Sequence, residues 1–149
     1  TGKAPLSEGF AVFREFLQIK PDLHVGGQVR NGTTKGIDEN ALAAYNAPFP
    51  DDDHKQGVRQ FPNLVPGTPR TPSAEPNKEA WKILREWEKP FLCAFSDKDP
   101  IFSGVENSFY KLIPGCKDMP HVTIEDAGHF LQEDQPEACV DAILSIKDI

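Results

Sequence analysis

The sequence has few cysteines, no long apolar run and no cluster of basic residues. Each of these absences reduces the number of functions that the protein could have. Three cysteines stand among 149 residues, an odd number without a C-x-x-C pair, which indicates reduced thiols in a cytoplasmic protein rather than a disulfide framework. No apolar stretch approaches the ~20 residues that a membrane span needs. Lysine and arginine are scattered and the net charge is −7, so neither a membrane nor a nucleic acid is an expected partner.

What is present divides into two parts of different character. The first part predicts short helices and loops without a clear strand: Ser7 and Asp38 are candidate N-caps, and a third helix is expected from about Asp53, disturbed at Pro62. Four prolines between residues 66 and 76 then predict a stiff connector. We therefore expect a helical part at 1–68, a proline-rich linker at 69–77 and a second part at 78–149.

The second part alternates helices with strands. After an amphipathic helix at 78–89, the pattern predicts a strand at Phe91–Phe95, a helix at Glu106–Ile113 and a strand at Val122–Ile124. Asp134 with Glu137 resembles a capping box that begins a last helix, and that helix is expected to bury Val140, Ile143 and Leu144. This order is typical of a parallel βαβα unit in an α/β protein.

Two parallel strands are too few to form an independent sheet. Parallel strands are normally buried on both faces and paired within larger sheets. The economical interpretation is that the remaining strands lie before Thr1. We therefore expect the chain to be the C-terminal portion of a larger α/β protein with a mostly parallel sheet.

His129 is the strongest catalytic candidate, because it follows the strand Val122–Ile124 and so lies at the carboxyl edge of the sheet, where open α/β sheets hold their sites. The preceding strand leads to Asp97 and Asp99. An acid followed by a histidine gives the last two members of a nucleophile–acid–base triad in hydrolase order. Asp99 is the preferred orienting acid because it lies past the end of the strand, directly before Pro100, whereas Asp97 is expected to be a solvated loop carboxylate.

The first member of such a triad is not evident. Gly32–Gly36 imitates the G-x-S-x-G nucleophile motif, with Thr34 in place of serine. That motif needs a buried strand before it and a helix after it, and Val25–Asn31 is too polar and too rich in glycine for a central strand. A mobile loop is the better interpretation of Gly32–Gly36.

Neither a metal ion nor a cofactor is expected. The acidic run Asp51–His54 cannot turn all of its carboxylates inward in one extended stretch, so a solvated loop is the simpler interpretation. His129 and Glu133 have the spacing of helical metal ligands, but the helix is expected to begin only at Asp134.

With these residues in view, the chain resembles the haloalkane dehalogenases of the α/β-hydrolase superfamily over nearly its whole length. Four segments in the same order carry the resemblance: A-A-Y-N-A-P-F-P-D at 43–51, G-V-R-Q-F-P at 57–62, F-S-D-K-D-P at 95–100 and A-G-H-F-L-Q-E at 127–133. The resemblance implies a helical cap (lid) at 1–68 and the terminal strands of the α/β-hydrolase core at 78–149. It also places the nucleophilic aspartate and the oxyanion hole before Thr1, in a missing N-terminal core.

The resemblance implies a covalent mechanism, in which a carboxylate displaces halide from carbon and His129 activates the water that hydrolyses the ester. The 149-residue chain alone is then expected to be inactive, and its partners are a small apolar halogenated substrate, water and halide. The residues that the resemblance implies for the substrate pocket are apolar: Phe10, Phe13, Phe61, Pro62, Val65, Ile101 and Phe102.

One departure from the family leaves the substrate open. Relatives of this branch use a cap tryptophan to donate an N–H to the halide, and the matching position here is Phe13, which has no such donor. The alternatives are another hydrolase of the same fold, such as an epoxide hydrolase, or a non-catalytic truncated chain. An epoxide hydrolase needs a pair of cap tyrosines, and Tyr45 is the one tyrosine in the first part.

Overall fold

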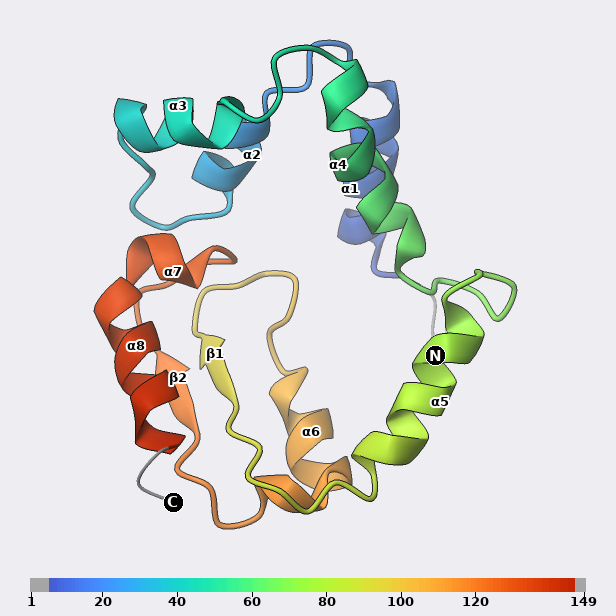
Figure 1. Ribbon diagram of the computed structural model, residues 1–149, viewed down its shortest axis with the longest axis vertical. Coiled ribbons are helices and arrows are strands. Elements are labelled where there is room, and N and C mark those ends of the chain that lie inside the picture. The colour runs from blue at the N-terminus through green and yellow to red at the C-terminus, as the bar shows by residue number, and fades with distance from the viewer. Residues whose placement is uncertain (1–5, 147–149) are drawn as a thin grey trace.

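The computed structural model describes residues 6–146, which form two lobes (Figure 1). The N-terminal lobe (residues 6–64) is helical, and its elements are α1 (Glu8–Ile19), α2 (Val25–Asn31), α3 (Glu39–Asn46), α4 (Gln56–Gln60) and the 3₁₀ turns η1 (Asp53–Lys55) and η2 (Phe61–Leu64). The C-terminal lobe (residues 74–146) contains the sheet, and its elements are α5 (Ala74–Leu84), β1 (Ala94–Ser96), α6 (Glu106–Leu112), η3 (Pro114–Cys116), β2 (Val122–Ile124), α7 (Leu131–Asp134) and α8 (Pro136–Ser145).

The helix starts of the N-terminal lobe agree with the sequence. Ser7 Oγ accepts a hydrogen bond from the Phe10 N–H at 3.3 Å, and Asp38 Oδ1 accepts one from the Ala41 N–H at 2.8 Å. Each bond satisfies one of the free N–H groups in the first turn. The third predicted helix is confirmed as η1 running into α4, and it tightens into η2 where Pro62 stands.

Arg59 joins α1 to α4 in this lobe. Its guanidinium is buried and donates to the carbonyl oxygens of Leu17 and Lys20 at the end of α1, the latter at 3.0 Å. The same group pairs with Asp52 at 2.7 Å. Those carbonyls have no partner within the last turn of a helix, so one side chain completes the C-terminus of α1 and fixes α4 beside it.

One feature of this region was not predicted from the sequence, and one expectation is wrong. Val25–Asn31 is the helix α2, whose glycines let it lie close to α3: a Cβ on Gly26 would stand 2.7 Å from the Leu42 carbonyl oxygen. Helix α5 begins at Ala74, inside the range 69–77 predicted as a linker and before the expected start at residue 78. Pro76 falls in the first turn, where a proline is tolerated because its missing N–H has no helical partner there.

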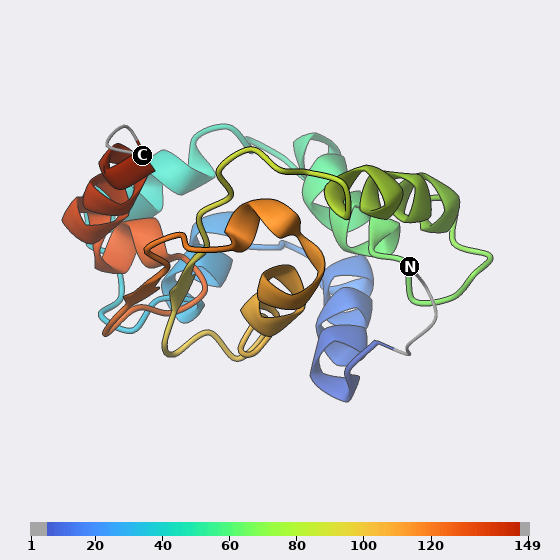
Figure 2. The same ribbon diagram turned by 90° about the horizontal axis from the view of Figure 1, so that it is seen from below.

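The two strands pair in parallel, as predicted, with Ala94, Phe95 and Ser96 opposite Val122, Thr123 and Ile124. The first strand is shorter and later than the predicted Phe91–Phe95, since β1 is Ala94–Ser96. Alternate residues along 91–95 nevertheless face opposite sides. Phe91, Cys93 and Phe95 belong to a core cluster with α5 and α6, whereas Leu92 and Ala94 belong to a second cluster with Ile124, Ala127 and α8. Figures 1 and 2 show α6 and α8 on the two sides of the sheet.

Helix α8 departs from its prediction in two ways. Its N-cap position is Gln135, and Asp134 does not cap it, because that carboxylate is engaged elsewhere. The expected buried residues Val140, Ile143 and Leu144 are exposed by 52%, 66% and 45%, and the buried contact of α8 with the sheet is made by Ala142. The amphipathic pattern of this helix therefore identified an apolar face that residues 6–146 do not cover.

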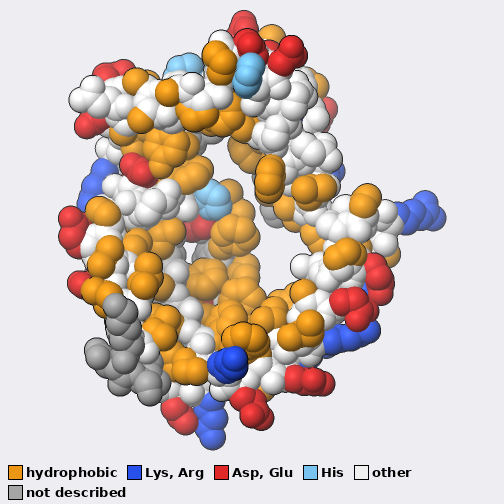
Figure 3. Space-filling view, viewed as in Figure 1, with side chains coloured by type: hydrophobic (Ala, Val, Ile, Leu, Met, Phe, Trp, Pro, Cys, Tyr) orange, Lys and Arg blue, Asp and Glu red, His pale blue; other side chains and the backbone are white. Residues whose placement is uncertain are grey.

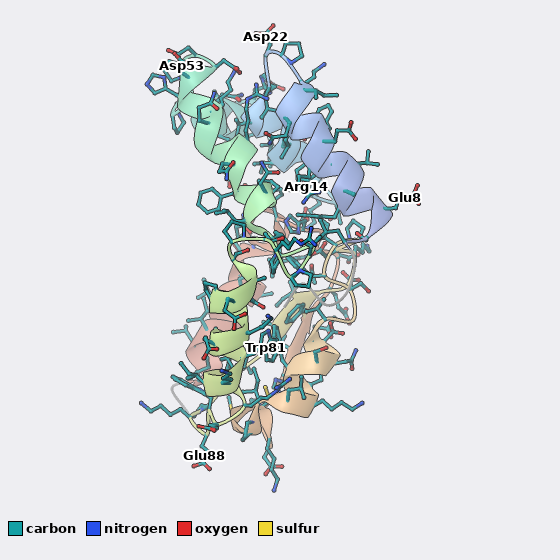
Figure 4. The ribbon with its side chains drawn as sticks, turned by 90° about the vertical axis from the view of Figure 1, so that its right-hand side faces the viewer. Glu8, Arg14, Asp22, Asp53, Trp81 and Glu88 are labelled. Atoms are coloured by element: carbon teal, nitrogen blue, oxygen red, sulfur yellow. The ribbon has the colours of Figure 1, made fainter. Side chains whose placement is uncertain are left out.

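The lobes stand as two tiers in the view of Figure 4, with Asp22 and Asp53 at the far end of the N-terminal lobe and Trp81 on α5 in the other. Trp81 stacks on Phe109 of α6, with ring centroids 5.8 Å apart. The space-filling view in Figure 3 shows a hollow between the tiers, with hydrophobic side chains along much of its wall. None of the helices between residues 6 and 146 has the length and apolar character to cross a membrane.

The contacts of Arg59 generate a stability prediction. Arg59→Met keeps the aliphatic stem but removes every donor, which leaves buried carbonyl oxygens unsatisfied. We expect the free energy of unfolding of the whole protein to fall by about 1–3 kcal/mol, measured by urea denaturation. Arg70→Met, the same change at an exposed position, is the control. An Arg59 variant as stable as the control would show that the guanidinium contacts contribute nothing.

Candidate active site

His129 and Asp99 meet at the carboxyl edge of the sheet, as the sequence predicted. His129 Nδ1 lies 3.1 Å from Asp99 Oδ2. The loops that carry them continue the pairing of the strands: the Asp97 N–H donates to the Ile124 carbonyl at 3.1 Å, and the Lys98 N–H donates to the Ala127 carbonyl at 3.0 Å. The register of β1 on β2 therefore extends into both loops and sets the distance between acid and base.

Asp99 is held by its own loop and is shielded from solvent. The residue is 7% exposed, and Oδ1 accepts the Ile101 N–H at 2.7 Å. An ionised carboxylate only accepts hydrogen bonds, so the proton between Asp99 and His129 belongs to Nδ1. The neutral imidazole then has an unprotonated Nε2, which is the atom that can take a proton from water.

Aromatic rings fix the plane of the imidazole. The ring of Phe102 stacks on His129 with centroids 5.5 Å apart and an interplanar angle of 29°. The ring of Phe130 meets His129 edge-on, at 5.1 Å and 80°. The His129 side chain keeps 29% of its surface exposed, so the residue is only partly buried.

The other candidate acid has a different task. Asp97 Oδ1 accepts the Ala127 N–H at 3.1 Å, so Asp97 joins the two loops, whereas the partner of His129 Nδ1 is Asp99. The sequence interpretation of Asp97 as a merely solvated carboxylate is therefore wrong, although the side chain is exposed. The choice of Asp99 over Asp97 as the partner of His129 agrees with the geometry.

The turn that delivers His129 depends on a close approach of two backbones. The left-handed residue of this turn is Asp126, with φ 55°, rather than a glycine. Gly128 is needed for space: a Cβ there would stand 2.5 Å from the carbonyl oxygen of Gly32 in the N-terminal lobe. The His129 loop is thus packed directly against the segment Gly32–Gly36.

That segment is anchored, contrary to the expectation of a mobile loop. Thr34 donates its N–H to Asp134, at 2.9 Å from Oδ2, and its hydroxyl to the Asp126 carbonyl at 2.8 Å. The Lys35 N–H donates to Asp134 Oδ1 at 3.0 Å. A hydroxyl engaged in this way, without the strand–turn–helix setting, supports no nucleophilic role for Thr34.

Asp134 is a buried carboxylate that the sequence interpretation assigned to the wrong partner. It is 4% exposed, and its Oδ2 accepts the Gly128 N–H at 2.8 Å. Burial raises the pKa of Asp134, but the backbone hydrogen bonds from Gly128, Thr34 and Lys35 together outweigh burial and hold the pKa below its ordinary value. A short-range capping pattern suggested a local role for this residue, and no sequence signal indicated its distant partners.

The predicted pocket residues fall into groups. Ile101 and Phe102 adjoin the acid and the base through the contacts given above. Phe10 and Phe13 contact each other on α1, with ring centroids 6.4 Å apart. Phe61 and Val65 are exposed, and Pro62 is half-buried. A single apolar pocket formed by all seven residues stays a prediction.

The remaining histidines and cysteines have structural contacts. His24 caps α2 by accepting the Gly27 N–H at 3.1 Å, and His121 accepts the Cys93 N–H at 3.1 Å. His54 pairs with Asp51 at 2.6 Å.

The cysteines are free thiols, and burial raises the pKa of Cys93 to about 12, so this thiol stays protonated. Between residues 6 and 146 no group of three or more metal-ligating side chains comes together.

A scan against models of protein families found no match. Among curated proteins, the chain is 49% identical over 137 residues to a haloalkane dehalogenase of Psychrobacter cryohalolentis, which covers 92% of the chain and 45% of the relative. It is 40% identical over 136 residues to a haloalkane dehalogenase of Mycolicibacterium paratuberculosis, covering 91% of the chain and 45% of the relative. The chain thus spans about half the length of the curated relatives it matches.

Solved structures give the same result. The tetrameric haloalkane dehalogenase DpaA from Paraglaciecola agarilytica NO2 superposes with a TM-score of 0.83 at 28% identity, over 97% of this chain and 48% of that one. The haloalkane dehalogenase DatA from Agrobacterium tumefaciens C58 superposes with a TM-score of 0.72, over 97% of this chain and 53% of that one. At 18% identity the second likeness concerns the fold alone.

The hydrogen bond between His129 and Asp99 predicts which ring nitrogen of His129 carries the proton. In the whole protein, the neutral His129 ring is expected to carry its proton on Nδ1, as shown by the ¹⁵N resonances of its two ring nitrogens. Asp99→Asn should change both resonances, because a carboxamide can also donate to Nδ1. Asp97→Asn, the same change two residues away, should leave them in place. A proton on Nε2 of the unsubstituted protein would contradict the geometry.

Proposed function

Because the chain belongs to the haloalkane dehalogenase family, we propose that the whole protein hydrolyses haloalkanes to an alcohol and a halide ion. The observation that carries this proposal is the 3.1 Å contact between His129 Nδ1 and Asp99 Oδ2, at the carboxyl edge of two parallel strands. It leaves Nε2 of the base available beside the apolar ring of Phe102. A base in an apolar setting suits a reaction of water with an uncharged substrate.

The proposed reaction has two steps. In the first, an aspartate carboxylate in the part of the whole protein outside this chain attacks the carbon that bears the halogen, forms an alkyl ester and releases halide. In the second, His129 Nε2 takes a proton from water and the oxygen adds to the ester carbonyl. The tetrahedral intermediate then expels the alcohol, which receives the proton from His129, and the carboxyl group loses its own proton to solvent. The chain of residues 1–149 has the base and the acid without that nucleophile, so we expect it to be inactive alone.

Asp99 supports the base in both halves of the second step. Its carboxylate fixes the tautomer with Nε2 free, and its charge stabilises the imidazolium while the proton resides on His129. Burial of Asp99 strengthens this interaction because little solvent screens it. Neither role needs a metal ion or a cofactor.

We assign the substrate pocket to the seven apolar residues named from the sequence, with Ile101 and Phe102 nearest the base. The hollow between the lobes has hydrophobic side chains along much of its wall (Figure 3), which supports an apolar substrate. The expected partners are a small halogenated alkane, water and halide. The free thiols support a reducing compartment such as the cytoplasm.

An epoxide hydrolase receives less support from the structure. The ring-opening of an epoxide requires donors for its oxygen, and Tyr45 is the cap tyrosine. Its hydroxyl donates instead to Glu133 Oε1 at 2.6 Å, and this hydrogen bond raises the pKa of Tyr45. The phenol therefore serves as a contact between α3 and α7.

Substitution of the base separates the two proposed steps. In the whole protein, His129→Ala should release about one halide per enzyme and then stop, with a mass increase on the enzyme equal to the alkyl group. Steady turnover should fall by about 10²–10⁴-fold, the usual contribution of a general base. Ion chromatography for halide and mass spectrometry of the protein measure these outcomes.

His54→Ala, at an exposed histidine paired with Asp51, is the matched control and should keep wild-type turnover. Turnover of His129→Ala near the wild-type rate would remove His129 from the mechanism. Absence of any halide release from the unsubstituted whole protein would refute the proposed function itself.

Phe13 generates a second prediction, about halide binding. If Phe13 faces the halide, Phe13→Trp in the whole protein supplies an N–H donor to a charged partner, worth roughly 1.5–3 kcal/mol. Since about 1.4 kcal/mol is a factor of ten, bromide should bind about tenfold more tightly or better, as measured by fluorescence titration. Phe16→Trp, the same change on the same helix, is the control. Equal bromide affinity in the two folded variants would show that Phe13 packs within the cap and does not face the halide.

A further inference from the structure

We propose that Asp134 is a positioning residue for the base: it fixes the backbone around His129 by holding it against the Thr34–Lys35 turn of the N-terminal lobe. The proposal rests on the proposed function for the meaning of His129 as a base. It goes beyond that function because it makes the position of the base depend on the cap.

The contacts of the Asp134 carboxylate define this role. Oδ2 accepts the Gly128 N–H at 2.8 Å, directly before His129 in the chain. Oδ1 accepts the Lys35 N–H at 3.0 Å, and the Thr34 N–H lies 2.9 and 3.0 Å from the two oxygens. One buried carboxylate therefore joins a peptide group of the His129 loop to two peptide groups about one hundred residues away in the sequence.

Further hydrogen bonds close the arrangement around the loop. The Phe130 N–H, directly after His129, donates to the Gly32 carbonyl at 3.2 Å. The Thr34 hydroxyl donates to the Asp126 carbonyl, and Lys35 Nζ donates to the Asp134 carbonyl at 2.7 Å. The segment Gly32–Lys35 thus contacts the residues on both sides of His129. A shift of this segment would therefore move His129 as well.

The carboxylate suits this task better than a neutral side chain does. Charged acceptors form shorter and stronger hydrogen bonds to N–H groups than neutral ones. An asparagine has one acceptor oxygen, and its NH₂ group would face a backbone N–H that also donates. Asp134→Asn should therefore lose part of the hold on the loop while keeping the size of the side chain.

A neighbouring hydrogen bond provides a control, because it also joins the two lobes but does not contact the His129 loop. Tyr45 on α3 donates to Glu133 on α7 at 2.6 Å, one residue before Asp134. This hydrogen bond joins the same two lobes without touching the peptide groups of Gly128 or Phe130. Tyr45→Phe therefore weakens the attachment between the lobes and leaves the His129 loop as it is.

The kinetic test measures the two chemical steps of the whole protein separately. Rapid-quench measurements give the rate of halide release and the rate of alcohol release in single turnovers. In Asp134→Asn, alcohol release should slow by about 10–10²-fold, the cost of a small misplacement of a catalytic group, whereas halide release changes less than about threefold. Tyr45→Phe and the exposed-site control Asp141→Asn should leave the ratio of the two rates unchanged.

A merely structural role predicts a different result, because loss of folded enzyme lowers halide release and alcohol release by the same factor. Equal slowing of both steps, or no slowing of either, would overturn the proposal. If Asp134→Asn does not fold, Asp134→Glu decides by the same ratio, since it keeps the charge and both acceptors but displaces them by one methylene.

A spectroscopic measurement separates this proposal from the proposed function. The ¹⁵N and ¹H resonances of the His129 ring report its hydrogen bond to Asp99 whether or not haloalkanes react. We expect these resonances to move in Asp134→Asn and to stay in Asp141→Asn. If the whole protein lacks dehalogenase activity but the resonances move, the proposed function fails and the positioning role stands. Unchanged resonances in a folded, active Asp134→Asn would refute the positioning role alone.

Discussion

The hydrogen bond between His129 and Asp99 fixes the geometry of the candidate site, and it follows from the register of two short strands. Ser96 stands opposite Ile124 in the parallel pair, and the pairing continues through the Lys98 N–H and the Ala127 carbonyl. Because both loops leave the same edge of the sheet, an acid on one and a base on the other come within 3.1 Å. The apolar clusters on both faces hold the strands in that register, so the packing of the core also sets the distance between Asp99 and His129.

The N-terminal lobe contacts the His129 loop through its backbone. Gly32 and Gly128 let two chain segments approach more closely than any other residue permits, and Asp134 collects N–H groups from both segments. Its buried charge is balanced by peptide dipoles, which is why its pKa is lowered despite burial. The N-terminal lobe is therefore joined to the His129 loop by hydrogen bonds, and in the proposed reaction a change in the position of this lobe would affect the second step.

Features of the structure that rest on local chemistry were predictable from the sequence. Ser7 and Asp38 cap helices because their partners lie three residues away, and Val122–Ile124 forms a strand because its β-formers stand between turns. The pairing of His129 with Asp99 followed from the order of strands and loops.

Features that rest on distant contacts were not predictable. Asp134 was misread as a helix cap because its partners lie about one hundred residues distant. Helix α2 was not predicted because glycines are unfavourable in helices, although this helix needs them to pack on α3. The apolar face of α8 was predicted to be buried and is exposed, since nothing in residues 6–146 covers it.

In the proposed mechanism, His129 activates water to attack an ester of the enzyme and does not direct water at the haloalkane itself. A single turnover of the whole protein in H₂¹⁸O, with enzyme in excess over substrate, distinguishes these reactions. Attack on the ester carbonyl leaves the alcohol with ordinary oxygen from the enzyme carboxylate and places ¹⁸O in the protein, and we expect mass spectrometry to show this outcome. An alcohol that carries ¹⁸O after a single turnover would contradict it.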